Sequence, residues 1–161
     1  MDKNYMTRES HQKLQEKLIN LREKELPEIS KEKLEAAEQG DLSENAGYEY
    51  AKQKLEMIQN KIRELSADLE NVQFIEDLPI KGIIISVGTI VTFHDMDSDK
   101  EVIYSILGPG DAEFGNDVIS YKSPLARGMI TKKVGDLVEI NVPEGKRTLK
   151  VLNIDTYKKK E

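Results

Sequence analysis

The sequence predicts an α+β protein in which an antiparallel coiled-coil hairpin of two helices, residues 1–78, precedes a small antiparallel-sheet domain, residues 79–161. Two observations lead to this prediction. Apolar residues recur with a helical spacing in the first half of the chain and with a strand spacing in the second. Charged residues make up 34% of the 161 residues and aromatic residues only 6%. This excess of charge favours long solvated helices over one compact globule.

The second half of the hairpin is the longest predicted helix. From residue 46 to residue 78 there is no proline and a single glycine. Its apolar residues are separated by alternating steps of four and three, which is the seam of a coiled coil. The seam residues are Ala51, Leu55, Ile58, Ile62, Leu65, Leu69 and Val72. A helix of about 30 residues at about 1.5 Å per residue spans about 45 Å, so the hairpin is a rod rather than a core.

The first half of the hairpin begins at Thr7, a residue type that caps helices. The same seam appears in its leucines, Leu14, Leu18 and Leu21. Pro27 has no backbone N–H to donate, so we expect a kink or break near it. Gly40 suits the left-handed conformation in which many helices end. Two such seams joined by a short turn fold back as an antiparallel hairpin.

After residue 79 the apolar period becomes two, which predicts strands. The predicted strands are 82–85, 89–93, 102–107, 137–142 and 149–157. The predicted connections are a turn at 95–99, a loop at 108–111, a short helix at 123–130 and a turn at 144–147. The acidic turn at 95–99 has the start of a calcium loop, but Lys100 replaces the required glycine and Ile106 the bidentate glutamate. We therefore interpret it as a hairpin turn.

Composition excludes several functions. The chain has no cysteine and two histidines, which leaves no thiolate chemistry and no imidazole-based metal site. No stretch approaches the roughly 18 apolar residues of a membrane span, so we expect a cytoplasmic protein without a membrane partner. The net charge of −6 arises in the first half, which has 12 basic and 18 acidic residues against 12 and 12 in the second. An acidic chain does not bind duplex nucleic acid through a broad basic face.

The residues best suited to catalysis or metal binding lie in the predicted turn of the hairpin. It reads Gly-Asp-Leu-Ser-Glu-Asn-Ala-Gly-Tyr from Gly40 to Tyr48. Asp41 followed three residues later by Glu44 fits a capping box, which would be purely structural. The same two carboxylates also suit one hard cation, which needs only one or two protein ligands when a partner supplies the rest. Both interpretations stay open on the residues alone.

This turn resembles the tip of the bacterial Gre transcript-cleavage factors, whose mark is a G-D-x-x-E-N-A-x-Y pattern. The opening MTRES, the PEI at 27–29 and the stretch ISYKSPLARGMITKKVGD at 119–136 follow the same family's order, so the resemblance covers nearly the whole chain. The rod lacks a dense basic face, which resembles the GreA type. One departure is Gly47, where the family carries a bulkier, often acidic residue. Glycine there loosens the first helical turn by roughly 1 kcal/mol.

The resemblance implies a factor that enters the secondary channel of backtracked RNA polymerase and stimulates the polymerase's own cleavage of the RNA 3′ end, without being an enzyme itself. It implies that Asp41 and Glu44 help to hold the second catalytic Mg²⁺ and its attacking water. It also implies that Asn45 and Tyr48 position RNA or stiffen the tip, and that Lys52 contacts the RNA 3′ end. The resemblance also implies DNA binding. Because the chain is acidic, we expect any such binding to be local or indirect.

For the second domain the resemblance implies an FKBP-like fold that docks on the polymerase, with Ser123 and Pro124 as candidate contacts. Fold alone does not make it an isomerase. We expect a monomer. Two other readings are a non-cleaving regulator that occupies the same channel and a binding or chaperone-like module without a polymerase role. The spacing of Asp41 and Glu44 favours cleavage over the first, and the full-length resemblance argues against the second.

Overall fold

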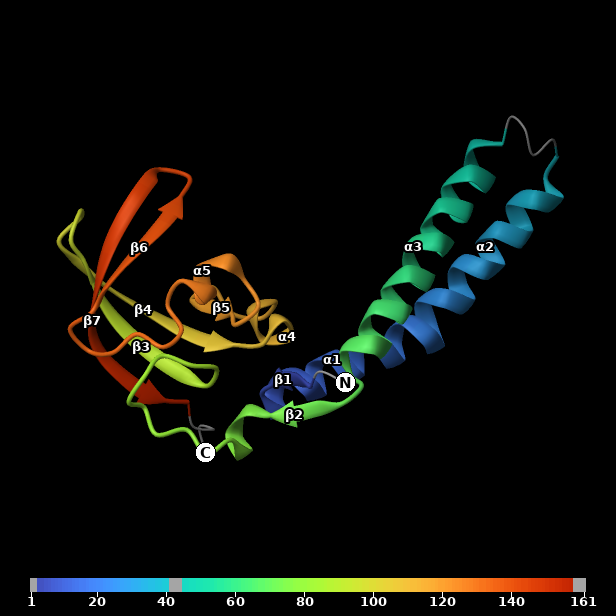
Figure 1. Ribbon diagram of the computed structural model, residues 1–161. Coiled ribbons are helices and arrows are strands. Elements are labelled where there is room, and N and C mark those ends of the chain that lie inside the picture. Colours follow the sequence, from blue (N-terminus) through green and yellow to red (C-terminus); the bar gives the residue numbers. More distant parts are fainter. Residues whose placement is uncertain (1–2, 41–44, 158–161) are drawn as a thin grey trace. The chain divides into compact units, whose positions relative to one another are not determined.

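The computed structural model describes residues 3–40 and 45–157 (Figure 1). It has the expected α+β organisation, with a helical hairpin followed along the chain by a sheet domain. Contacts divide the chain into a hairpin unit, Gln12–Glu70, and a sheet unit, Met1–His11 with Asn71–Glu161. The sequence alone predicts a domain boundary between residues 78 and 79. The contacts instead group residues 71–78 and the N-terminal segment with the sheet.

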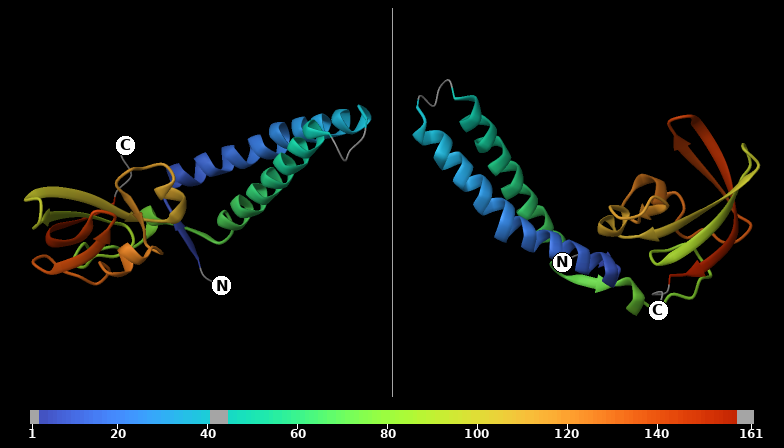
Figure 2. Two further views of the ribbon diagram at one scale, coloured as in Figure 1. Left: turned by 90° about the horizontal axis from the view of Figure 1, so that it is seen from above. Right: turned by 180° about the vertical axis from the view of Figure 1, so that it is seen from behind.

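The hairpin is built from four helical segments. They are α1 (Arg8–Asn20), η1 (Leu21–Glu25), α2 (Leu26–Glu38) and α3 (Ala46–Asp68). Helices α2 and α3 run side by side in both views of Figure 2. The predicted seam is confirmed from Ala51 to Leu65, because α3 buries every seventh residue, and the first helix buries its seam leucines and one isoleucine. These buried residues are Ala51, Ile58, Leu65, Leu14, Leu18, Leu21 and Ile29. The predicted end of the seam is wrong: α3 stops at Asp68, and Val72 lies in strand β2 (Val72–Phe74).

The irregularity expected at Pro27 is a π-helical turn rather than a break. Pro27 cannot donate to the carbonyl four residues before it. Immediately ahead of it the chain forms η1, in which the N–H of Leu26 donates to the carbonyl of Leu21, five residues back. The wider turn lets α2 continue to Glu38 with the proline in its first turn.

The predicted helix ends are also found. The Oγ1 of Thr7 accepts a hydrogen bond from the Ser10 N–H at 3.3 Å, so Thr7 caps α1. After α2, Gln39 is the C-cap and Gly40 has a φ of 141°, a conformation that side chains disfavour. These residues end the first half of the hairpin where the sequence predicts it.

The sheet unit contains a five-stranded sheet with the order β5-β4-β3-β7-β6. Its strands are β3 (Thr89–Asp95), β4 (Lys100–Leu107), β5 (Val118–Ser120), β6 (Leu137–Val142) and β7 (Gly145–Thr156). Neighbouring strands are antiparallel except for β4 and β5, which are parallel. The prediction of a wholly antiparallel sheet is therefore wrong for this pair. A parallel pair needs a crossover, and short helix α4 (Pro109–Ala112) lies in it, where a loop was predicted.

The prediction of a strand at 82–85 is also wrong. The segment is rich in isoleucine, but it pairs with no strand of the sheet, and Ile85 instead exchanges backbone hydrogen bonds with Thr131 and Lys132 in the connection before β6. The turn at 95–99 is confirmed between β3 and β4. The helix at 123–130 is confirmed in a shorter form, α5 (Pro124–Arg127). Strand β7 begins at Gly145, four residues earlier than predicted, because Gly145 already pairs with Val142.

The core of the sheet unit is a cluster of twelve buried residues centred on the sheet. Phe93, in the central strand, is fully buried. Ala126 of α5 and the following Met129 pack against this face and have no exposed surface. Alternation along β3, in which residues 89, 91, 93 and 95 are buried, is the period-two pattern that the sequence predicts.

The N-terminal segment belongs to the sheet unit through contacts that no sequence pattern predicts. Strand β1 (Asn4–Met6) pairs in parallel with β2 (Val72–Phe74). The buried carboxylate of Asp111 then accepts hydrogen bonds from the N–H of Thr7 at 3.0 Å and from its hydroxyl at 2.6 Å. The Gly108 N–H donates to the same carboxylate at 2.9 Å. A side chain at Gly108 would lie 1.8 Å from the Tyr5 carbonyl, so this approach requires glycine.

Candidate functional site

The candidate catalytic and metal-binding residues Asp41 and Glu44 lie outside the described residues. The structure describes the two helices between which they lie in the sequence. The sequence places them between the end of α2 at Glu38 and the start of α3 at Ala46. The N-cap of α3 is Asn45, so the helix starts after both acids rather than at the predicted capping box.

Asn45 joins the two helices at this end of the hairpin. Its Oδ1 accepts the Tyr48 N–H at 3.0 Å, which caps α3. Its Nδ2 donates to the Ala36 carbonyl of α2 at 2.6 Å. Both ends of the amide are therefore bonded, one to each helix, and the stiffening of the tip that the resemblance implies stays a prediction. A role for Asn45 in positioning RNA stays a prediction.

Tyr48 is half-buried on the seam one turn into α3. The Lys33 ammonium of α2 lies 5.9 Å from the centre of its ring, at the outer limit of a cation–π contact. Lys52 is exposed four residues further along α3 and thus on the same face of the helix. Their proposed contacts with RNA remain predictions.

Gly47 has a local consequence that the sequence did not reveal. A Cβ atom at this position would lie 3.3 Å from the Oδ1 of Asn45, the oxygen that caps α3. A larger side chain must therefore displace or crowd the cap. Glycine lowers helix propensity here, but it leaves the Asn45 hydrogen bonds room to form.

Ser123 and Pro124 form the start of α5. The Ser123 Oγ accepts the Ala126 N–H at 3.2 Å and donates to the Ser120 carbonyl at 2.7 Å. Its hydroxyl is thus occupied by the local fold, whereas Pro124 and Arg127 are exposed. Contact with a partner at Ser123 and Pro124 stays a prediction.

Two carboxylates of the sheet unit have shifted pKa values. The Arg8 guanidinium donates to both oxygens of Asp77, at 3.0 and 2.6 Å, and holds the pKa of that carboxyl below its ordinary value. Burial raises the pKa of Asp95, but hydrogen bonds from the N–H groups of Asp97 and Ser98, with the nearby Arg147, bring it below the ordinary value. Both groups stabilise local structure.

No cluster of three or more metal-ligating side chains occurs within residues 3–40 and 45–157. In the same ranges no helix is both long and apolar enough to cross a membrane. Asn45, whose amide is already bonded to backbone groups, is a poor third ligand for an ion beside it. Any cation bound by Asp41 and Glu44 would therefore take its remaining ligands from water or from a partner.

Fold and candidate site together define a protein in which a helical hairpin carries an acidic turn and a separate sheet unit follows. Residues 4–74 match the model of the transcription elongation factor N-terminal domain, and residues 82–156 match the model of the GreA/GreB C-terminal domain. The chain belongs to the GreA/GreB family of transcription elongation factors.

Relatives over the full length agree with this assignment. The chain is 38% identical over 154 residues to transcription elongation factor GreA of Beijerinckia indica, covering 96% of this chain and 98% of the relative. It is 36% identical to GreA of Rickettsia felis, with 97% and 96% covered. Among solved structures, GreA factor homolog 1 (Gfh1) of Thermus thermophilus is 27% identical over 96% of this chain and 99% of that one, with a TM-score of 0.45.

Two structural roles were not predicted: that of Asn45 as the N-cap of α3, and that of Asp111 as the buried acceptor for Thr7. Asn45 directly precedes the helical run and is a preferred N-cap residue, so the signal for its role was present. The pairing of Asp111 with Thr7 joins positions 104 residues apart. No local pattern in the sequence indicates it.

Proposed function

We propose that this chain binds bacterial RNA polymerase, inserts its hairpin into the secondary channel of a backtracked complex, and stimulates the polymerase's cleavage of the nascent RNA 3′ end. The observation that carries the proposal is the pair of carboxylates, Asp41 and Glu44, in the turn of a hairpin in a GreA/GreB family member. The chain would act as a cofactor of the polymerase, in the cytoplasm and as a monomer, rather than as an enzyme.

The donor chemistry of the tip fits Mg²⁺, a hard cation that prefers carboxylate oxygen. Asp41 and Glu44 would hold the ion together with ligands from the polymerase active site. When bound, the ion would activate water and stabilise the charge that develops during phosphodiester hydrolysis. Asn45 would keep the acidic turn in place by joining α2 to α3.

The remaining candidate residues divide between two tasks. Lys52, exposed on α3, would attract the phosphates of the extruded RNA, and Tyr48 would orient that strand or support the helix below it. Pro124, exposed at the start of α5, would contact the polymerase, with Ser123 holding the α5 start in shape. Binding thus depends on the sheet unit and cleavage on the tip.

The test is RNA cleavage in a stalled, backtracked elongation complex with and without the protein. We expect the wild-type chain to accelerate cleavage, and we expect Asp41→Asn and Glu44→Gln each to abolish the acceleration while polymerase binding persists. Lys52→Ala should weaken the response to a smaller extent. Asp68→Asn, at the opposite end of α3, is the matched control and should behave as wild type. Binding without any acceleration by the wild-type chain would instead identify a non-cleaving regulator.

Metal binding by the free protein is a second check. Because two carboxylates leave most of the octahedral Mg²⁺ shell to water, calorimetric titration of the isolated chain should detect only weak binding. Tight binding that disappears in Asp41→Asn would contradict this and indicate a preformed metal site.

A further inference from the structure

We infer that the sheet unit carries a second docking surface for RNA polymerase and that the matching part of the polymerase is an acidic, amphipathic protein segment. The inference rests on the proposed function, because it takes the polymerase as the partner. The surface, called the basic-apolar surface below, consists of Lys81, Ile83, Ile84, Lys132, Lys133 and Val134.

The apolar part of this surface is exposed to solvent. Ile83 is 64% exposed, Val134 58% and Ile84 37%. The segment from Pro79 to Ser86 also lines an open groove of about 370 Å³. Single exposed apolar residues are common, but several of them beside a groove are typical of an interaction site. Ile83 and Ile84 are thus exposed in a segment that does not pair as a strand.

Backbone hydrogen bonds hold the two segments of the surface side by side. The Ile85 N–H donates to the Lys132 carbonyl, and the Thr131 N–H donates to the Ile85 carbonyl, both at 2.9 Å. Ile85 is fully buried and fixes this junction in the core. Ile84 and Lys133 each lie one residue from it, so the apolar and basic side chains belong to one rigid region of the sheet unit.

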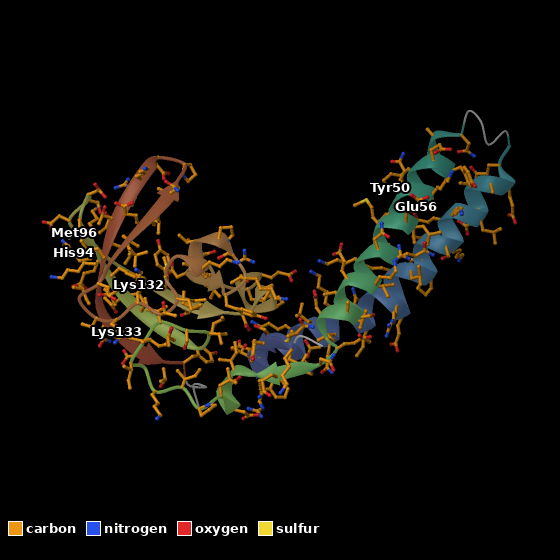
Figure 3. All side chains as sticks on the ribbon, viewed as in Figure 1. Tyr50, Glu56, His94, Met96, Lys132 and Lys133 are labelled. Atoms are coloured by element: carbon orange, nitrogen blue, oxygen red, sulfur yellow. The ribbon has the colours of Figure 1, made fainter. Side chains whose placement is uncertain are left out.

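The charge of the region favours an acidic partner. Within the described residues, no ion pair involves Lys81, Lys132 or Lys133. Asp136 is the acid next to them in the turn, and its Oδ2 accepts the backbone N–H of Lys133 at 2.9 Å. Figure 3 labels Lys132 and Lys133 on the loop that precedes β6. An acidic, amphipathic protein segment would pair its carboxylates with these lysines and pack its apolar side chains against the isoleucines, whereas nucleic acid would pair only with the lysines.

A strained residue lies inside the same region. Thr131 has a φ of 77°, which is unfavourable for a β-branched side chain. Among residues 3–40 and 45–157 the other non-glycine residues with positive φ are Asn71 and Asp99, of the types that tolerate it. Strain of this kind persists where the surrounding structure enforces it, and it clusters at functional sites. The connection that runs from Pro124, the proposed contact, to Lys133 contains this residue, so both contacts would share one loop.

The experiment measures binding of the full-length protein to bacterial core RNA polymerase by fluorescence titration at two salt concentrations. The test variants are Ile83→Ser/Ile84→Ser and Lys132→Glu/Lys133→Glu. The matched controls are Met96→Ser and Lys100→Glu. Met96, in the turn between β3 and β4, and Lys100, the first residue of β4, are exposed at the Asp95 end of the sheet, whereas Gly82 packs against Ile154 near the other end. Circular dichroism and thermal unfolding of each variant monitor folding.

We expect each test variant to weaken binding roughly tenfold, an effect of about 1.4 kcal/mol, and both controls to bind as wild type. The loss for the lysine variant should shrink at high salt because exposed charges are screened. At saturating concentration the test variants should still stimulate cleavage, since their tip is intact.

Several outcomes would overturn the inference. If wild type and both test variants bound polymerase equally, the basic-apolar surface would not be a docking surface, and the proposed function would stand. Failure of the wild-type chain to bind polymerase at all would overturn the proposed function as well. Concentration-dependent dimerisation lost in Ile83→Ser/Ile84→Ser would make the surface an interface between two copies. Binding of a single-stranded RNA or duplex DNA oligonucleotide lost in Lys132→Glu/Lys133→Glu would assign it to nucleic acid.

Discussion

The hairpin unit and the sheet unit bury their apolar residues in different ways. In the hairpin one row of residues is buried along the seam, with one fully covered position per heptad in α3. In the sheet unit twelve buried residues from strands, a short helix and connecting segments surround one another. A single row loses few neighbours when one side chain shrinks, whereas a three-dimensional cluster loses contacts on every side. Stability should therefore be spread along the hairpin and concentrated in the sheet unit.

The largest expected effect that tests this difference is a cavity in the sheet unit. Phe93→Ala removes a fully buried ring from the central strand and should lower the free energy of unfolding by about 3–5 kcal/mol. Ile58→Ala in the hairpin seam should cost roughly 2 kcal/mol, at the low end for such truncations, because its surroundings can close in. Hydrogen exchange of β3 and α3 amides measures each unit separately. Equal losses for the two variants would contradict the comparison.

A second prediction concerns the long-range hydrogen bonds of the sheet unit. Asp111→Ala leaves the backbone N–H groups of Thr7 and Gly108 without their buried acceptor and should cost about 1–3 kcal/mol. Exchange should accelerate at β1 and β2 first, because Thr7 directly follows β1. Asp117→Ala, at an exposed acid of the same connection, is the control and should leave exchange and unfolding unchanged. Loss of α3 protection instead would show that Asp111 stabilises the hairpin.

A third prediction uses backbone strain. Thr131→Gly removes the β-branched side chain from a φ of 77° and should raise the stability of the sheet unit by roughly 1 kcal/mol, after the entropy that glycine adds to the unfolded chain. Thr148→Gly, in the regular strand β7, should be destabilising. Urea unfolding measures both. A destabilised Thr131→Gly would mean that the threonine side chain makes a contact worth more than the strain.

The smallest expected effect lies at the hairpin tip. Alanine in place of Gly47 should add roughly 1 kcal/mol through helix propensity. The Cβ would also press on the Asn45 cap at 3.3 Å, so we expect a net gain well below that figure. Ala46→Gly, at the neighbouring position, gives the propensity effect alone with opposite sign. Thermal unfolding followed by circular dichroism compares the two, and a full gain in Gly47→Ala would show that the cap adjusts freely.

What could be predicted from the sequence differs between the units for the same reason. The seam from Ala51 to Leu65, the cap at Thr7 and the end at Gly40 depend on residues a few positions apart, so local patterns indicated them correctly. The strand at 82–85 was predicted wrongly because its isoleucines satisfy the local preference for a strand, but the segment bonds through Ile85 to the connection before β6 instead of to a strand. The helical run from residue 46 was predicted correctly, but its cap was not, because Asp41 and Asn45 are both good cap residues and local preference does not distinguish them.

For the site, the sequence alone placed Asp41, Glu44, Asn45, Tyr48 and Lys52 in one turn and the helix after it, since neighbours in the chain stay neighbours in space. It also determined the heptad seam, the change to strand period after residue 79, and the absence of cysteine chemistry. The tertiary structure decided the parallel β4–β5 pair, the bonds from Thr7 to Asp111, and the junction of Ile85 with Lys132. These depend on which distant segments meet, and that choice follows from the packing of the whole sheet unit rather than from any local preference.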